Sequence, residues 1–257
     1  MIGFFFKKAF FDGWDNLFSL VLLNAVFVAL AALGLLLPSV SAAPGWLLFV
    51  AAALALIAGT VWWSACVFAL QRVADFGSVK IADIPSALRA GLVPGLQIGA
   101  LMAALLVLLR IGLPFYFTRG GLAGVLAAGV VFWLALATFL SLQYYLPLRA
   151  RLGGGFIKNM RKSFILFLDN PLFSVFLFLY NAVSLVLSGF LAFLAPGPAG
   201  AALALDCALR LRLYKYDWLE RNPGAPRRAV PWDELLEEDR ELVGKRTLKG
   251  MIFPWKE

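Results

Sequence analysis

A few polar side chains inside long apolar segments carry the residue types that could do chemistry in this chain. Asp206 and Arg210 are one helical turn apart, the spacing of an ion pair on a helix face. Ser174, Asn181 and Ser188 recur at intervals of seven residues and would share one face of a helix. Inside a membrane, such groups mark a path for a solute or a proton, or they serve helix packing. Packing is the simpler interpretation, because serine hydroxyls commonly bond the carbonyls of their own helix.

Asp206 is the most informative of these residues because of its expected depth. The step from Pro196 to Asp206 spans about 15 Å at about 1.5 Å per residue, which places the carboxylate near the bilayer centre. A lone carboxylate there costs on the order of 3 kcal/mol. We therefore predict that Asp206 faces the protein interior and pairs with Arg210, with Asn24 or Asn181 as further hydrogen-bond partners. Two interpretations stay open: a buried pair that fixes helix register, and a site that binds a solute or couples to protons.

The inventory of reactive residues excludes most catalytic sites. Histidine is absent, and Cys66 and Cys207 lie in separate apolar segments. No zinc site, haem site or His-based triad can be assembled from these residues, and isolated thiols in apolar segments are typical of small buried hydrophobes. We predict no catalytic residue, no metal site and no cofactor, so the protein is not expected to be an enzyme.

The composition is that of a membrane protein. Of the 257 residues, 62% are hydrophobic and 15% are charged, and the mean hydropathy is +0.85, whereas about a quarter of residues in soluble domains are charged. Several apolar runs reach the length of about 18 residues that a transmembrane helix needs. They cover residues 17–37, 46–70, 92–109, 122–142 and 171–195, and a shorter run follows at 197–209.

Lysine and arginine are concentrated on one side of these predicted spans. That side has Lys7, Lys8, Arg72, Lys80, Arg89, the basic residues of 149–162 and the tail from Arg210 onward, and the other has Arg110 and Arg119. The positive-inside rule then places both termini in the cytoplasm, which requires an even number of spans and favours six. Basic cytoplasmic loops are expected of an inner-membrane protein and account for the net charge of +8. We therefore predict no nucleic-acid partner.

Two stretches far apart in the chain repeat the same letters in the same order. Asp15-Asn16, Leu17-Phe18-Ser19 and Asn24-Ala25-Val26 correspond to Asp169-Asn170, Leu172-Phe173-Ser174 and Asn181-Ala182-Val183. Each stretch follows a segment with one apolar helical face, at 2–13 and 156–168, the pattern of a helix that rests in the membrane interface. Asp-Asn is expected to cap the following helix through a side-chain oxygen.

A third unit has the same layout with less sequence identity. It consists of an amphipathic segment at 80–92, a break at Pro94-Gly95 and then a span. The first span of each unit is expected to end in proline, at Pro38, Pro114 and Pro196, and superposition of the units would bring these prolines together. We predict three repeated hairpins, each preceded by an interfacial amphipathic helix, in a pseudo-threefold arrangement. The repeats cover about 1–77, 78–153 and 154–221 of an all-α transmembrane domain, residues 1–221, with six transmembrane helices.

Two further features concern packing and the tail. Gly91, Gly95 and Gly99 form consecutive GxxxG steps, which let a second helix approach closely, and internal packing is expected ahead of self-association. Residues 222–257 form a predicted cytoplasmic tail with one short helix from about Trp232 to Val243. This helix is either solvated or binds a partner.

Three stretches carry a family resemblance. The segments "LPSVSAAP", "VFALQRVADFG" and "GFIKNMRKSFILFLDNPLF" lie within residues 1–215. They resemble the YesL-like family of bacterial polytopic membrane proteins of unknown function. The resemblance implies a multi-pass protein of the bacterial inner membrane that is often associated with carbohydrate uptake systems, and it supplies no catalytic residues.

The leading hypothesis is a non-enzymatic membrane protein that assists or regulates another membrane system, such as carbohydrate uptake. Its expected partners are the lipid bilayer and another membrane protein or transporter complex, and its oligomeric state stays open. The alternative is a small-solute transporter or channel. Co-purification separates the two hypotheses, because only the first requires a protein partner.

Overall fold

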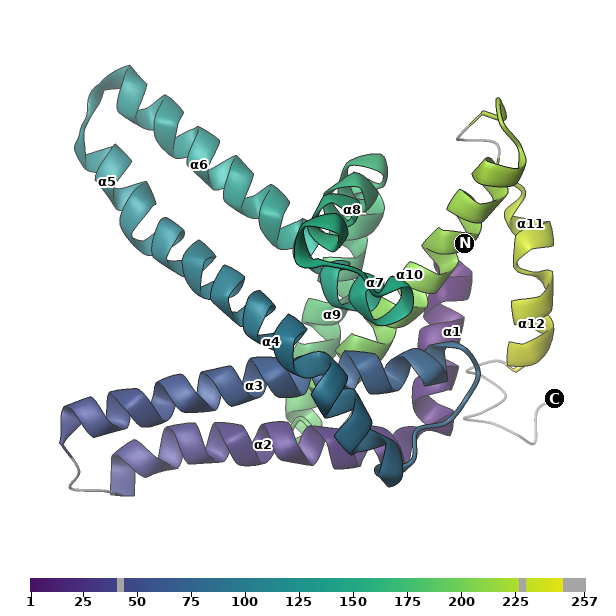
Figure 1. Ribbon diagram of the computed structural model, residues 1–257, viewed down its shortest axis with the longest axis horizontal. Helices are drawn as coiled ribbons and strands as arrows, with labels where there is room; N and C mark the ends of the chain where they lie inside the picture. The colour runs from purple at the N-terminus through teal and green to yellow at the C-terminus, as the bar shows by residue number, and fades with distance from the viewer. Residues whose placement is uncertain (41–43, 227–229, 247–257) are drawn as a thin grey trace.

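The computed structural model describes residues 1–40, 44–226 and 230–246, and every regular element in these ranges is helical (Figure 1). The elements are α1 Ile2–Asp15, α2 Leu17–Val40, α3 Gly45–Ala74, the 3-10 turn η1 Ile81–Asp83, α4 Ile84–Val107, the π turn η2 Leu108–Gly112, α5 Leu113–Thr118, α6 Gly121–Leu142, α7 Tyr145–Leu152, α8 Phe156–Asp169, α9 Pro171–Ser188, the 3-10 turn η3 Gly189–Leu191, α10 Gly197–Arg221, α11 Trp232–Leu235 and α12 Glu237–Val243. The predicted all-α class is confirmed.

Within the described residues, five helical segments are long and apolar enough to cross a membrane. They are Leu17–Gly34, Gly45–Ala74, Ile81–Thr118, Gly121–Leu152 and Pro171–Leu191, with mean hydropathy between 1.9 and 2.4. Their large apolar side chains point outward: Leu122 is 75% exposed, Leu172 85% and Phe190 86%. Such an apolar surface suits lipid rather than water, so the chain is a multi-pass membrane protein.

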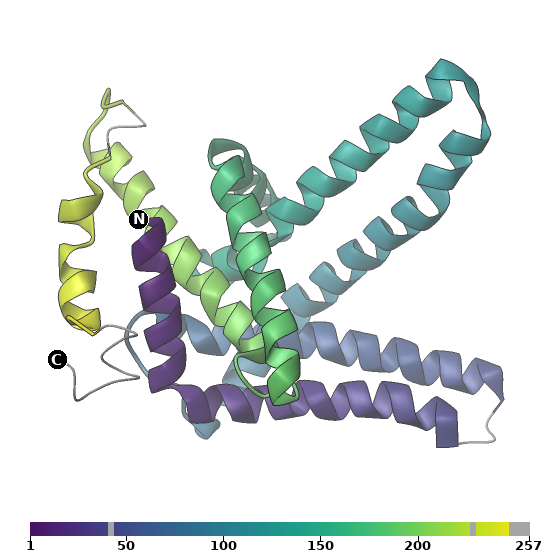
Figure 2. The ribbon, with the colours of Figure 1, turned by 180° about the vertical axis from the view of Figure 1, so that it is seen from behind.

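Two long hairpins extend from a common base. Helices α2 and α3 form the first, and α4 with α5 pairs with α6 in the second (Figure 1). The two hairpins diverge away from the base, where α1, α7, α9 and α10 gather, as the view from behind also shows (Figure 2). The base therefore contains most of the buried side chains, and the hairpins expose apolar surface.

Helix α10 is the most deeply buried element of the base. Most of its residues from Gly197 to Lys215 are buried, and it packs against α1, α2, α3 and α9. Its residues 197–209 are apolar apart from Asp206, and its other charged side chains lie from Arg210 onward. An inner helix needs small residues for close packing and can keep polar groups that would be costly against lipid.

The predicted glycine packing is confirmed, but the predicted break at Pro94-Gly95 is wrong. A Cβ at Gly91 would lie 2.9 Å from the backbone nitrogen of Ala65 in α3, and one at Gly95 would lie 2.7 Å from the Cα of Val61. Helix α4 continues through Pro94 as one element, so residues 80–92 do not form a separate interfacial helix. Contact with α3 over this length supports the helix across the missing hydrogen bond, as neighbouring helices do for prolines in membranes.

Two of the three expected proline ends are also wrong. Helix α2 runs past Pro38 to Val40, and Pro114 lies in the first turn of α5, which runs to Thr118. Proline is compatible with a first helical turn, where its missing amide hydrogen has no helical partner to lose. The π turn η2 immediately before Leu113 adjusts the backbone at this point.

The two best-matched copies have similar local structure. Helices α1 and α8 each contain 14 residues, and each ends at an aspartate followed by asparagine. The Asn16 amide donates to the carbonyl of Asp12 at 3.0 Å, and the Asn170 amide donates to the carbonyl of Leu166 at 3.3 Å. The expected side-chain cap on the following helix is absent at Asn170. Both asparagines instead close the helix that precedes them.

Candidate functional site

Asp206 is fully buried in α10, but the prediction that Arg210 is its partner is wrong. Neither carboxylate oxygen of Asp206 has a hydrogen-bond partner among the described residues. The Arg210 guanidinium instead reaches Asp75 after α3, with Nη1 2.6 Å from Oδ1, and Asp239 in α12, with Nη2 2.8 Å from Oδ1. The Arg210 side chain is 19% exposed, so its charge keeps some hydration that a pair with buried Asp206 would forfeit.

Asp75 is shared by two arginines near Asp206. Arg151 of α7 donates to Asp75 Oδ2 at 3.0 Å from Nη1 and lies 2.9 Å from Oδ1 through Nη2. Asp206 lies one helical turn before Arg210 on α10, next to these charges. A charged cluster that fixes helix positions therefore exists, but it consists of Asp75, Arg151, Arg210 and Asp239, with Asp206 buried beside it.

Phe76 joins this cluster to α1. It has a φ of 61°, in the left-handed region that large residues seldom adopt. The Lys8 ammonium lies 3.3 Å from the centre of the Phe76 ring and the Arg210 guanidinium lies 5.2 Å from it, both at cation–π distances. Buried Lys8 also pairs with Asp12 at 2.8 Å. Burial raises the pKa of the Asp12 carboxyl above its ordinary value, although Lys8 opposes this shift.

Asn24 is fully buried and holds the turn before α10 rather than Asp206. Its amide nitrogen donates to the carbonyl of Leu194 at 3.0 Å and to that of Pro196 at 2.7 Å. Its Oδ1 accepts from the backbone N–H of Ala199 at 2.7 Å. These three bonds give Asn24 a structural role at the start of α10.

The remaining predicted residues are not gathered into one site. Ser174 donates to the carbonyl of Asn170 at 2.9 Å, and Ser188 donates to that of Leu185 at 2.7 Å. Both serines thus bond their own helix, in agreement with the simpler interpretation. Asn181 borders an apolar cavity, and its Oδ1 has no hydrogen-bond partner within the described part of the chain.

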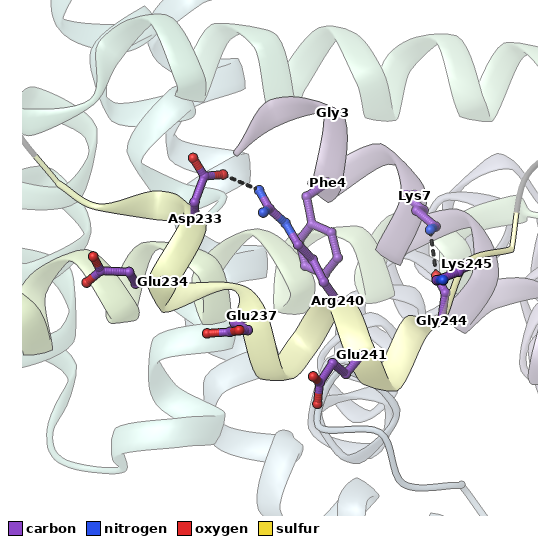
Figure 3. A pocket seen from close by; sticks show the side chains of 10 residues that line it. All are labelled: Gly3, Phe4, Lys7, Asp233, Glu234, Glu237, Arg240, Glu241, Gly244 and Lys245. Carbon is purple, nitrogen blue, oxygen red and sulfur yellow. Dashed lines mark hydrogen bonds and ion pairs between the residues drawn. The ribbon is translucent and has the colours of Figure 1, made fainter.

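A second feature is a cavity of about 960 Å³ between α1 and the tail helices, which we call the tail groove (Figure 3). It is lined by Gly3, Phe4 and Lys7 from α1 and by Asp233, Glu234, Glu237, Arg240, Glu241, Gly244 and Lys245 from the tail. The tail expected as one helix consists of α11 and α12, separated at Leu236. Leu236, the residue between the two helices, is fully buried and anchors the tail to the base.

The tail groove is lined by four carboxylates and three cationic side chains, Lys7, Arg240 and Lys245, an excess of one negative charge. Arg240 is paired with Asp233 at 2.8 Å, and Lys7 Nζ donates to the carbonyl of Gly244 at 2.7 Å (Figure 3). Glu234, Glu237 and Glu241 are exposed, and none of the three has an ion pair with a described residue. This arrangement favours a cationic group, such as a lysine or arginine side chain from another protein.

Besides the Lys7–Gly244 hydrogen bond and buried Leu236, further contacts among the described residues fasten the tail to the base. Asp239 is 1% exposed and is bonded to Arg210, Val243 is 1% exposed, and Arg246 pairs with Asp15 at 2.8 Å. The tail groove is therefore a fixed feature of the folded chain, because one wall belongs to α1 and the other to a docked tail.

Sequence patterns did not single out Asp75, Phe76, Lys8 or Asp239. The signal for Asp75 and Phe76 was their position directly after an apolar run, in "VADFG", where a span leaves the membrane. Asp239 is one of several acidic residues in the tail, and nothing in its sequence context separates it from them. Comparisons with protein-family models, curated proteins and solved structures find no match to this chain.

Proposed function

We propose that the protein is a non-enzymatic accessory or regulatory partner of another membrane system and that it binds its partner through the tail groove. One observation carries this proposal: a docked tail and α1 together form a groove that is lined by Glu234, Glu237 and Glu241, none of which has an ion pair with a described residue. Loops of membrane proteins on the cytoplasmic side are rich in lysine and arginine, so a membrane partner presents the cations that this groove favours. Carbohydrate uptake is the proposed system, on the resemblance to YesL-like proteins.

The proposed topology has six spans, with α10 as the sixth, and both termini in the cytoplasm of a bacterium whose inner membrane holds the protein. The distribution of lysine and arginine supports this orientation. The matched Asn16 and Asn170 bonds support a repeat of the two units that begin with α1 and α8. In the middle unit the amphipathic segment is continuous with α4, so the pseudo-threefold arrangement is proposed from the layout of the three hairpins. A reporter fused after Glu257 should be accessible from the cytoplasm, and access from outside only would overturn the topology.

The alternative, a small-solute transporter or channel, has weaker support. The cavity among the spans is lined mainly by aliphatic and aromatic side chains, with Thr60, Gln143 and Asn181 as its polar side chains. A path for a polar solute would need more hydrogen-bonding groups. Solute flux into proteoliposomes that contain the purified protein would favour this alternative.

Co-purification tests the leading proposal. The triple variant Glu234→Gln, Glu237→Gln and Glu241→Gln removes three carboxylate charges from the groove, and Glu238→Gln is the matched control, since Glu238 is exposed on α12 but does not line the groove. After cross-linking in native membranes, we expect the same membrane protein with wild type and Glu238→Gln and its loss with the triple variant. A partner that the triple variant retains, or no reproducible partner at all, would refute the proposal.

A further inference from the structure

The membrane part contains a cavity of about 900 Å³ among α2, α3, α4, α6, α9 and α10. Its lining residues come from both hairpins, from α9 and from α10; the two hairpins diverge beside α9 (Figure 1). Aromatic rings of Phe27, Trp63 and Phe178 contribute to its walls. Gly59 of α3 also lines it, and nothing lies within 4 Å of the position that a Cβ would take there. The space is thus open at Gly59.

One wall of the cavity offers an unused hydrogen-bond acceptor. The Gln143 amide nitrogen donates to the carbonyls of Leu140 at 3.0 Å and Ser174 at 3.1 Å, which fixes the orientation of the amide. The buried Oε1 of Gln143 has no hydrogen-bond partner in the described ranges. Buried acceptors normally accept at least one hydrogen bond. A bound molecule with a hydrogen-bond donor would supply the bond that this oxygen lacks.

The volume distinguishes a lipid from a partner helix. A spanning helix about 30 Å long and about 10 Å across occupies roughly 2,400 Å³, far more than the cavity of about 900 Å³. Ligand sites of about 300–1,000 Å³ with apolar walls and few polar groups are typical of small amphiphilic molecules. We propose that this cavity binds one bilayer phospholipid with a glycerol headgroup, whose aliphatic chain lies along the aromatic walls.

The headgroup follows from the position of Gln143. Gln143 lies between α6 and α7, and the last turn of α7 carries Arg149, which has no ion pair with a described residue, and Arg151, which is paired with Asp75. In the proposed arrangement the anionic phosphate lies on the side of Arg149, where a basic side chain favours it, and a glycerol hydroxyl supplies the donor for Gln143 Oε1. A choline headgroup has no such donor. Asn181 lies about 10 Å along α9 from Ser174. Its Oδ1 is a second acceptor of the cavity without a hydrogen-bond partner among the described residues, and an acyl chain there leaves it unpaired, so a leucine at this position would suit the chain better.

Quenching of tryptophan fluorescence by brominated lipid tests the proposal on the full-length protein. The purified protein in detergent is titrated with phosphatidylglycerol that carries a dibrominated acyl chain, and Trp63→Phe identifies the signal from the cavity. We expect saturable quenching that unlabelled phosphatidylglycerol reverses and that phosphatidylcholine with the same chains reverses about tenfold less effectively. Quenching that rises linearly with lipid, or equal competition by the two headgroups, overturns the proposal without any variant.

Matched variants place the lipid in the cavity. Gly59→Leu fills the open space and should weaken binding by about tenfold or more, whereas Gly129→Leu, also with nothing within 4 Å but outside the cavity, should leave it unchanged. Gln143→Leu should abolish the preference for phosphatidylglycerol over phosphatidylcholine. Asn181→Leu should leave binding unchanged or tighter. Equal binding by both glycine variants, loss of binding in Asn181→Leu, or cross-linking of Gly59→Cys to another polypeptide would each refute a lipid at this place.

Discussion

Replacement of Asp239 by alanine tests how the tail is held against the membrane helices. Asp239 is 1% exposed and accepts hydrogen bonds from Arg210, at 3.2 Å from Nε and 2.8 Å from Nη2, and from the Tyr214 hydroxyl at 3.0 Å. Hydrogen bonds to charged groups contribute about 1.5–3 kcal/mol. Arg210 would keep Asp75 as a partner, which limits the loss of docking free energy. We expect tail docking to weaken by about 2–3 kcal/mol, or about 30- to 150-fold in the docking equilibrium.

Hydrogen exchange measures this change directly. Amides of α12, Glu237–Val243, should exchange faster in Asp239→Ala, while those of α10 should not change. Glu238→Ala is the control, because Glu238 is the neighbouring residue and is exposed. If α12 is equally protected in both variants, the buried side chains Leu236 and Val243 hold the tail and the ion pair contributes little.

Four further predictions are checked by thermal unfolding of the purified protein. Asn24→Ala removes three hydrogen bonds from the turn before α10 and should lower stability by about 2–3 kcal/mol. Gly95→Ala places a Cβ 2.7 Å from the α3 backbone and should lose about 1–3 kcal/mol, whereas Gly129→Ala, with no atom within 4 Å, should be neutral. Asp206→Asn removes a buried charge without a hydrogen-bond partner among the described residues, so the unfolding temperature should stay the same or rise, and a fall of several degrees would contradict this account. The pKa of Asp12 is raised above 3.8 in the folded state. Its contribution to stability is therefore complete below pH 3.8 and is lost as the pH rises through the raised pKa. In Asp12→Asn, stability should depend less on pH over this range.

Features set by local periodicity could be predicted from the sequence. Long apolar runs gave the five candidate spans because every backbone polar group in lipid must be bonded within its own helix. The spacing of Gly91, Gly95 and Gly99 indicated close helix packing, since a missing Cβ has a geometric consequence that does not depend on the rest of the fold. Proline was a poor boundary signal, because a packed neighbour lets α4 continue through Pro94.

Charge partners could not be predicted in the same way. The sequence offered Asp206 as the neighbour of Arg210 at one helical turn, but Asp75 is 135 residues away in the chain and Asp239 is 29 residues away. A local rule ranks partners by spacing alone, whereas the choice among carboxylates depends on hydration and on which helices meet at the base. Arg210 therefore pairs with two carboxylates at the edge of the base and not with the one buried beside it.

The position of Arg210 also explains why the tail belongs to the same folded unit as the membrane helices. Its guanidinium contacts Asp75 after α3 and Asp239 in α12. It also makes a cation–π contact with the Phe76 ring, as does the ammonium of Lys8 from α1. Each of these contacts crosses from one helix to another, and the contact with Asp239 crosses the boundary expected near residue 222. Arg210 is part of α10 and contacts both Asp75 after α3 and Asp239 of the tail. The free energy of tail docking therefore depends on how α10 packs in the base. A tail whose docking depends on α10 presents its groove only when the membrane helices are assembled.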